Sequence, residues 1–451
     1  MNQTQENPLS QISTQRFSQL SEEEKKNFLL GRHFDSSKIE HYKELLSDFS
    51  SAHHKYPILQ EMSENTLSHF PLPFGIVPNV LINKNLFDVP MVIEESSVVA
   101  AASKSAKLWK EFAGIKAQTL CQEKMGHIHF FWFSQSTLLF SWFETIGRKY
   151  LQEKLAPLET NMKKRGGGIL SLTLKNCTEK LAHYYQLEIV ALTGEAMGAN
   201  FLNTLLEAAS QILKDKAPSE GNIDILMSIL SNYTPNCRVK ASVVAPVKEL
   251  DLFFQQTTQT ANFCQRFLSA IKISKVSLER AVTHNKGIFN GIDGVILATG
   301  NDFRAIEACG HAYAGRLGSY QGLSEAYLEM GHENNSLFHF SLELPMAVGV
   351  VGGLTRLHPL ANFSLELLKN PSSNQLMEIA CSIGLLQNFA AVSSLVTTGI
   401  QKGHMRMHLL NILKHLEATK EEKANAVDFF KDKTISFTAV CEFLESLRRV
   451  H

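Results

Sequence analysis

Hydrophobic positions in the middle of the chain follow two patterns, and each predicts a different kind of element. Residues 127–133, 169–174 and 187–193 are rich in aromatic and β-branched side chains, so three strands are expected there. Residues 138–155 and 194–213 instead space their apolar positions as amphipathic helices do. This alternation predicts an α/β or α+β unit of about a hundred residues, inserted within a larger domain.

Capping signals and turns predict the elements on either side of this unit. Ser21 with Glu24, and Thr419 with Glu422, have the spacing of a capping box, so helices are expected near both ends of the chain. A further helix is expected at 98–113, with the two serines before it as caps. Four prolines are expected to break the chain ahead of that helix into short extended pieces: Pro71, Pro73, Pro78 and Pro90.

The composition limits the kinds of partner. Lys plus Arg and Asp plus Glu both number 44, so the formal net charge is zero and gives no field that attracts nucleic acid or anionic lipid. The cysteines are dispersed without a CxxC pair, which fits reduced thiols better than a disulfide framework. The polar start MNQTQENPLSQ, and no uncharged apolar run of about 18 residues, indicate a soluble cytoplasmic protein with neither membrane nor nucleic acid as partner.

Three charged residues stand at places where enzymes often keep reactive groups. Lys286, within HNKGIFNG, could stabilise an oxyanion in a pocket, although an exposed loop lysine is the simpler interpretation. Residues 293–302 form an apolar run that predicts a strand ending at Asp302, and residues 303–316 predict the next helix. Asp302 therefore either lines a site or caps that helix. Glu95 stands at a helix start, where a carboxylate is stabilised by the helix dipole, so a structural role alone would also explain it.

Two further segments carry weaker signals. His404 and His408 lie four residues apart, but Met405 stands where the zinc-protease pattern needs Glu, so no metal site is predicted. His404 remains a candidate general acid. The segment GEAMGAN (194–200) could open a helix and let its backbone approach a pyrophosphate, although it is not GxGxxG and could be only a tight turn.

Taken together, these segments resemble the class II, bacterial-type hydroxymethylglutaryl-CoA reductases. Their motifs occur in the family's order and, with the weaker ENTLS ahead of them, cover the chain from about Glu64 to His408. The block around Lys286 and Asp302 is the most specific of them. The motifs are EESSVVAAAS, GEAMGAN, HNKGIFNGIDGVILATGNDFRAIEACGHAYA, LELPMAVGVVGGLTRLHP and GIQKGHMRMH.

The resemblance implies a reaction and the residues that perform it. The family reduces (S)-3-hydroxy-3-methylglutaryl-CoA to mevalonate and free CoA, using two hydrides from NAD(P)H. In that chemistry Lys286 stabilises the oxyanion and Asp302 holds the lysine. Glu95 protonates the aldehyde oxygen, and His404 protonates the departing thiolate. The matching substrate contacts are Ser97, Arg280 and Asn290, and the matching cofactor contacts are Glu159, Glu195, Met197, Gly198 and Asn200.

The resemblance also implies the fold class and the assembly. It is a multidomain α+β or α/β protein with active sites at the interface of a homodimer or higher homo-oligomer, and Glu64 and Asn65 match the family's interface motif. A large helical domain with a central sheet binds the acyl-CoA, a small inserted non-Rossmann α/β domain binds the dinucleotide, and a C-terminal helical flap carries the histidine. The expected boundaries are 1–120 and 232–398 for the large domain, 121–231 for the small domain and 399–451 for the flap.

The sequence departs from the family pattern without losing a catalytic group. Glu195 replaces the usual Asp of DAMGAN, Ser96 replaces the usual Pro, and ENTLS replaces ENxIG. Counting back from the GGG run, Glu159 falls where the family meets the adenosine ribose, and a carboxylate there favours NADH by repelling a 2′-phosphate. A surface glutamate at a helix end is the alternative, and the basic run at 163–165 could instead accept the phosphate of NADPH.

Three functions stay open at this point. The first is a biosynthetic reductase of the mevalonate pathway to isoprenoids, and the second is the same site run oxidatively in mevalonate catabolism. The third is a homologue that binds acyl-CoA but has lost catalysis, which predicts that at least one catalytic group is missing. All four groups are present in the sequence, which argues against the third function.

Overall fold

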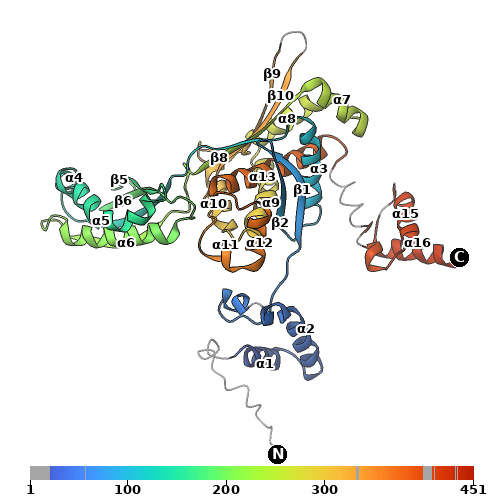
Figure 1. Ribbon diagram of the computed structural model, residues 1–451, viewed down its shortest axis with the longest axis horizontal. Helices are drawn as coiled ribbons and strands as arrows, with labels where there is room; N and C mark the ends of the chain where they lie inside the picture. Colours follow the sequence, from blue (N-terminus) through green and yellow to red (C-terminus); the bar gives the residue numbers. More distant parts are fainter. Residues whose placement is uncertain are drawn as a thin grey trace, which may run out of the picture.

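Buried apolar side chains gather in three separate cores in this computed structural model. The largest core draws on residues 77–117 and 237–396, the second on 128–213, and the third on 409–444. The second core stands to one side of the central body, and the last helices stand on the opposite side (Figure 1). The structure describes residues 21–55, 57–331, 335–399, 409–410, 412–431, 433 and 435–450.

The largest core is built on a four-stranded antiparallel sheet in the order β3-β8-β10-β9. Its two central strands, β8 (Arg238–Pro246) and β10 (Leu337–Pro345), bury alternate side chains, as strands with one covered face do. The edges are β3 (Lys116–Thr119) and β9 (Ser324–Glu329). The helices of this body are α3 (Val98–Glu111), α7 (Val247–Thr258), α8 (Phe263–Val276), α9 (Leu278–Ala298), α10 (Phe303–Ala314), α11 (Leu354–Leu357), α12 (Pro359–Leu367) and α13 (Ser373–Val396).

The helix α13 lies at the centre of this body and packs against α9, α3 and the sheet (Figure 1). By length and composition it is apolar enough to cross a membrane, but 72% of its most apolar window is buried inside the protein. Its apolar residues surround the helix instead of forming one stripe, which is typical of a helix enclosed on all sides. We therefore describe α13 as a core helix.

A two-stranded hairpin completes the central body. The strands β1 (Phe74–Ile82) and β2 (Asn85–Val92) pair antiparallel, with an irregularity of register between Val77 and Val80. Pro78 lies at this bulge, where a residue without an N–H is tolerated. The proline-rich stretch is thus extended, as expected, and its two strands are paired with each other.

The second core belongs to a sheet in the order β5-β6-β4-β7, with α5 (Arg148–Lys163) and α6 (Ala199–Lys216) packed on it. The three expected strands are confirmed as β4 (Lys124–Trp132), β5 (Gly168–Asn176) and β6 (Tyr184–Leu192), and β7 (Ile223–Leu230) adds a fourth. The helical stretch after β4 begins as α4 (Ser136–Trp142) and a π-helical turn, η4 (Phe143–Gly147).

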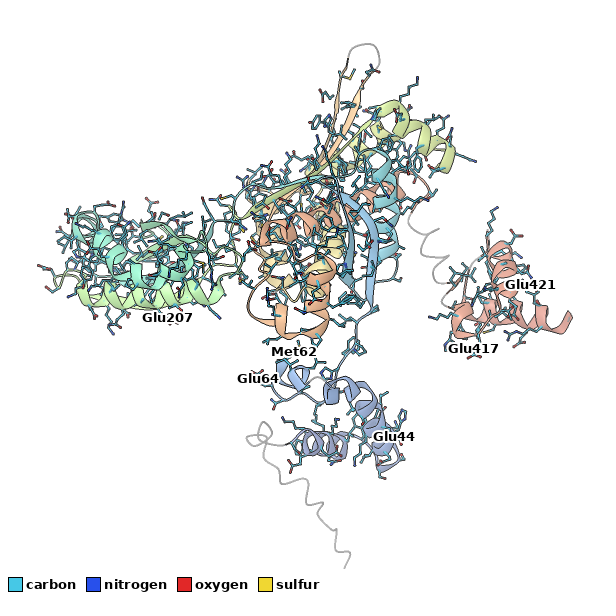
Figure 2. The ribbon with its side chains drawn as sticks, in the orientation of Figure 1. Glu44, Met62, Glu64, Glu207, Glu417 and Glu421 are labelled. Atoms are coloured by element: carbon cyan, nitrogen blue, oxygen red, sulfur yellow. The ribbon has the colours of Figure 1, made fainter. Side chains whose placement is uncertain are left out.

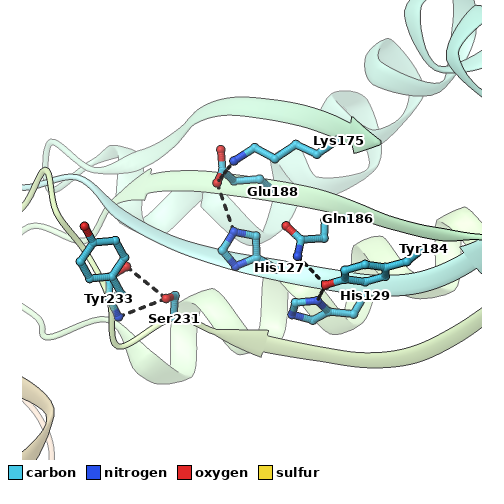
Figure 3. Close-up of polar contacts among 8 residues, drawn as sticks. All are labelled: His127, His129, Lys175, Tyr184, Gln186, Glu188, Ser231 and Tyr233. Carbon is cyan, nitrogen blue, oxygen red and sulfur yellow. Dashed lines mark hydrogen bonds and ion pairs between the residues drawn. The ribbon is translucent and has the colours of Figure 1, made fainter. Parts of the chain in front are cut away.

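The other face of this small sheet carries hydrogen-bonded polar side chains (Figure 3). His127 contacts Glu188 over 3.1 Å, and His129 contacts the Tyr184 hydroxyl over 2.6 Å. Lys175 pairs with the same glutamate over 2.5 Å. This face therefore carries a polar network beside the exposed side chains of Met227 and Ile229, whereas the face under α5 and α6 is buried and apolar.

The strand predicted at 293–302 is wrong. Its first residues continue α9, which runs without a break from Leu278 to Ala298, and its last residues form the turn to α10. A short apolar run does not distinguish a buried strand from a buried helix, and here Val295 and Ile296 are fully buried because α9 is enclosed by neighbouring elements. Lys286 consequently lies on a helix and not in a loop.

The capping boxes at Ser21 and Thr419 are confirmed, since both hydroxyls accept from the backbone three residues later. At α3 the cap is different: Ser97 is the N-cap residue but its hydroxyl makes no capping bond. The N-terminal elements are α1 (Glu22–His33), α2 (Ser36–Lys55) and the short 3₁₀ helix η3 (Pro57–Met62). The C-terminal helices are α15 (Lys420–Phe429) and α16 (Phe437–Val450).

Candidate active site

Lys286 and Glu95 meet at the surface of the central body. The Lys286 ammonium donates to Glu95 Oε2, and Asn290 Nδ2, one helical turn further along α9, donates to the same oxygen over 3.1 Å. Glu95 is placed by the turn between β2 and α3, so the contact joins residues 191 positions apart. The two charged side chains are 58% and 38% exposed, so a substrate can reach them.

Asp302 caps the start of α10. Its Oδ1 accepts from the backbone N–H groups of Arg304 and Ala305 over 3.1 and 3.2 Å. The capping interpretation is therefore confirmed. Among the described residues Lys286 is bonded to Glu95 and not to Asp302, so the expected contact between Asp302 and the lysine stays a prediction.

Arg280 presents a half-buried guanidinium near the N-terminal end of α9, the helix that carries Lys286. Within the described part of the chain this guanidinium has no hydrogen-bond or ion-pair partner, and burial lowers the pKa of Arg280. It lies six residues before Lys286, about 9 Å along the helix axis. An unpaired planar guanidinium is suited to bind a carboxylate through two parallel hydrogen bonds.

Ser97, two residues after Glu95, occupies an uncommon backbone conformation. Its φ is 73° and its ψ is −12°, a left-handed conformation that disfavours side chains other than glycine. Its hydroxyl leaves the first turn of α3 uncapped. Strain of about 1–3 kcal/mol at such a position is typical of residues near functional sites.

A carboxyl pair lies behind the lysine. Asp293 follows Lys286 by two helical turns and is hydrogen-bonded to Glu307 of α10. Burial, with the charges of Glu307 and Glu94, raises the pKa of Asp293 to about 8, although Lys286 opposes the shift. Its buried Oδ1 has no hydrogen-bond donor, so a proton shared between the two carboxyls explains how they lie together.

A second group of residues forms around the segment 193–198 at the base of the small sheet. Gly198 is the N-cap of α6 with a φ of 100°, and a Cβ atom there would lie 2.3 Å from the Thr193 side chain. A Cβ at Gly349 would lie 2.4 Å from the backbone N of Met197. Asn301 holds this glycine through a 2.8 Å bond to its N–H. The turn before Asp302 is thus joined to the GEAMGAN loop.

The loop is also tied to α13 and to a buried lysine. Glu195 Oε2 accepts from Ser373 N over 2.6 Å, and Val350 N donates to the Glu195 carbonyl over 2.9 Å. Lys124 Nζ lies 2.6 Å from Thr193 Oγ1 and 3.0 Å from a carbonyl of the loop. The carboxylate of Glu195 therefore anchors the loop to the central body.

Glu159 is buried, with 3% exposure, so the alternative of a surface glutamate is wrong. Its Oε2 accepts from Ile169 N over 2.6 Å, and Lys163 pairs with its other oxygen over 3.1 Å. These contacts close the turn between α5 and β5, and its place as a cofactor contact stays a prediction.

The structure thus brings the predicted residues together in two groups. Glu95, Lys286 and Asn290 are in direct contact, and Glu195, Met197 and Gly198 form a separate loop, with Asn200 exposed in the first turn of α6. His404 lies outside the described residues. A cavity of about 750 Å³ between α3, α7 and α13 includes none of the predicted residues.

Residue-by-residue interpretation missed Lys124, Asn301 and the Asp293–Glu307 pair. Asn301 and Gly349 sit in glycine-rich turns, and a glycine in a strand-like segment signals close backbone approach. Nothing local distinguishes Lys124 from a surface lysine, because its burial depends on packing between β4 and a loop 69 residues away.

Comparisons with known proteins agree with this arrangement. The family model for hydroxymethylglutaryl-coenzyme A reductase matches residues 32–409. A 3-hydroxy-3-methylglutaryl-coenzyme A reductase of Archaeoglobus fulgidus is 32% identical over 87% of this chain and 86% of its own length. A probable reductase of Borreliella burgdorferi is 35% identical over 84% and 82%.

Solved structures match over nearly the whole chain. The class II 3-hydroxy-3-methylglutaryl-CoA reductase of Streptococcus pneumoniae, bound to NADPH in open conformations, is 35% identical with a TM-score of 0.69 over 95% of this chain and 100% of its own. A second structure of that enzyme covers 97% of this chain with a TM-score of 0.70. The mixed multidomain fold is that of a nicotinamide-dependent oxidoreductase. The chain belongs to the hydroxymethylglutaryl-CoA reductase family, and its solved neighbours are of class II.

Proposed function

We propose that this protein reduces (S)-3-hydroxy-3-methylglutaryl-CoA to mevalonate and free CoA in isoprenoid biosynthesis. The contact of Lys286, Glu95 and Asn290 at an accessible surface carries the proposal, because it pairs an oxyanion-stabilising cation with a proton donor. Arg280 is half-buried on the same helix and has no side-chain partner among the described residues, so it is suited to bind the substrate's carboxylate. Ser97 and Asn290 contact the rest of the acyl group.

The residues divide the work in two stages. In the first stage Lys286 stabilises the oxyanion formed from the thioester carbonyl, and His404 protonates the departing CoA thiolate. In the second stage Glu95 protonates the aldehyde oxygen as it becomes an alcohol, while Asp302 holds the lysine. NAD(P)H supplies the two hydrides when bound. Each stage also takes up one proton, so an acid near the carbonyl is needed twice.

The role of His404 has its own test. A His404→Gln variant is expected to slow reduction of the thioester more than reduction of free mevaldehyde, because only the thioester releases a thiolate. Both rates are measured with the purified full chain. Equal slowing of the two reactions would contradict the assignment.

We place the dinucleotide on the GEAMGAN loop. The first turn of α6 has no capping side chain, and Gly198 leaves its backbone N–H groups open, which fits a diphosphate. NADH is the expected cofactor on the argument that Glu159 disfavours a 2′-phosphate, and NADPH is the alternative if the basic run at 163–165 receives that phosphate. Comparing the rates of NADH and NADPH oxidation, by absorbance at 340 nm, decides between the two cofactors.

A homodimer or larger homo-oligomer is the proposed assembly, in the cytoplasm. Glu64 and Asn65 lie in the exposed turn after η3, and Figure 2 shows Glu64 in the N-terminal helical part. The extended chain that follows leaves Phe70 91% exposed, which a second copy would cover. Light scattering on the purified protein tests the proposed assembly, and a monomer at micromolar concentration would contradict it.

The first experiment is nicotinamide absorbance at 340 nm with hydroxymethylglutaryl-CoA. Oxidation of NADH or NADPH supports the reductive reaction. Activity only with mevalonate, CoA and the oxidised cofactor would favour catabolism, and silence in every mixture would favour an acyl-CoA-binding homologue. The Glu95–Lys286 contact speaks against the last outcome.

A further inference from the structure

Lys124 is a buried lysine directly beneath the GEAMGAN loop. It is the first residue of β4 and is 3% exposed. Its ammonium contacts Thr193 Oγ1 over 2.6 Å and the carbonyl of Ala196 over 3.0 Å. Thr193 in turn packs against Gly198, the residue that begins α6. The ammonium is therefore separated from the start of the helix by one side chain.

The charge of Lys124 is not matched by a carboxylate. Within the described residues no acidic group lies within ion-pair distance of its ammonium, and the nearest acidic influence, Glu195, bonds to Ser373 N. Burial lowers the pKa of Lys124, while Cys237 and Glu195 oppose that shift. A buried unmatched charge is unfavourable for folding, so a purely structural position is better filled by an apolar residue.

The loop does not need the lysine to close. Thr193 Oγ1 already donates to the Ala196 carbonyl over 2.7 Å, and Thr193 C=O accepts from Ala196 N over 3.2 Å. The turn is thus held by its own residues. What Lys124 adds is a positive charge at the N-terminus of an 18-residue helix whose first turn contains no acidic residue and no side-chain cap.

We propose that Lys124 is a positioning residue whose buried charge strengthens binding of the dinucleotide's diphosphate at the α6 N-terminus. The proposal rests on the proposed location of the cofactor at this loop. The ammonium acts through Thr193 and the loop backbone, and adds its field to that of the helix dipole. Because it is shielded from solvent by burial, its field is weakened less by salt than that of a surface lysine.

The test measures binding of ADP-ribose, which carries the diphosphate, to the full chain by calorimetry. Lys124→Gln keeps hydrogen bonding to the loop but removes the charge, and Lys124→Met removes both. Each is expected to weaken ADP-ribose binding about tenfold while adenosine, which has no phosphate, binds as before. The KM for hydroxymethylglutaryl-CoA is expected to stay the same.

The matched control is Thr193→Val, which removes the hydroxyl contacts and keeps the charge. It is expected to change ADP-ribose affinity less than threefold, because the ammonium stays in place through its bond to the Ala196 carbonyl and keeps its charge. Equal weakening by Thr193→Val and Lys124→Gln would overturn the proposal, because loop geometry alone would then explain both. Unchanged ADP-ribose binding in both lysine variants would overturn it as well.

A third variant separates this proposal from the location of the cofactor. Gly198→Ala places a Cβ against Thr193 in a left-handed conformation, so it distorts the α6 N-terminus. If ADP-ribose binding survives this change, the cofactor does not bind at the loop and the proposed location fails. If Gly198→Ala abolishes binding while the lysine variants bind normally, only the role of Lys124 fails.

Discussion

Two lysines in two regions of this protein lie in opposite surroundings. Lys286, on α9 of the central body, is 58% exposed and bonded to Glu95. Lys124, at the base of the small sheet, is 3% exposed and bonded only to a hydroxyl and a carbonyl within the described chain. The first region holds a paired charge where reactants can reach it. The second holds an unmatched charge that reactants cannot touch.

The difference follows from the surroundings of each side chain. A catalytic cation must exchange its partner for the oxyanion during the reaction, so a bond to one accessible carboxylate is suitable. A charge that only strengthens binding need not move, and burial keeps its field constant. The bond from Gly349 N to Asn301 Oδ1 connects the two regions, because Asn301 precedes Asp302 and Gly349 packs against Met197 of the loop.

The largest expected effect is on turnover, when Lys286 of the first region is replaced. Lys286→Met is expected to lower kcat by about 10³-fold, because the oxyanion loses the cation that is bonded to Glu95. Binding of ADP-ribose should not change, unlike in the Lys124 variants. The measurement is steady-state turnover at 340 nm, with far-ultraviolet circular dichroism as the check on folding. Wild-type turnover in this variant would refute the site.

A smaller effect tests Ser97, the strained residue at the start of α3. Ser97→Ala keeps the left-handed residue's Cβ and removes the hydroxyl, so the KM for hydroxymethylglutaryl-CoA is expected to rise about three- to tenfold. Ser97→Gly should raise KM equally while leaving stability within about 1 kcal/mol, since relief of strain offsets glycine's greater freedom when unfolded. An unchanged KM in both variants would remove Ser97 from the substrate site.

The carboxyl pair gives the first region a pH dependence below pH 8. Because the pKa of Asp293 is raised, the folded protein holds a proton that the unfolded chain releases above about pH 4. This contribution to stability is complete below that pH and is lost as pH rises through the raised pKa. The urea midpoint of the wild type should therefore fall between pH 5 and 8.

Asp293→Asn and Glu307→Gln should each flatten that fall, since either removes one member of the pair. The comparison is between slopes of midpoint against pH and not between absolute stabilities. Slopes identical to that of the wild type would show that the two carboxyls do not share a proton.

The smallest effect concerns the polar face of the small sheet. Glu188 is bonded to Lys175 and His127, and although burial acts in the other direction these bonds hold the pKa of Glu188 below its ordinary value. Glu188→Gln is expected to lower stability at pH 7 by less than about 1 kcal/mol, because Lys175 is largely solvated.

The loss should diminish at an acid pH below the lowered pKa of Glu188, where the wild-type carboxyl is protonated. Thermal unfolding at both pH values measures it. ADP-ribose affinity should stay the same, because these residues lie on the face of the sheet away from α6 (Figure 3). A variant that bound the ligand more weakly would connect this face to the loop above Lys124.

Local sequence predicted most of the small sheet and the capping boxes, because alternation and capping depend on residues close in the chain. It failed at 293–302, where burial on all sides removed the periodicity that separates helix from strand. Family motifs named Glu95 and Lys286, but their contact depends on a packing of β2, α3 and α9 that no local pattern encodes. Lys124 was missed because only tertiary structure buries it.

The two connections to the small sheet run side by side, since Leu120 N and Cys121 N both donate to the carbonyl of Arg238. Asn236 also bonds to Glu123 over 2.9 Å. The pairing of β3 with β8 therefore closes a loop that contains the whole small sheet. During folding, an early-formed small sheet would bring its own ends together and remove most of the entropy that this closure requires. Mutations in its core should consequently slow folding of the central body, far from any residue they touch.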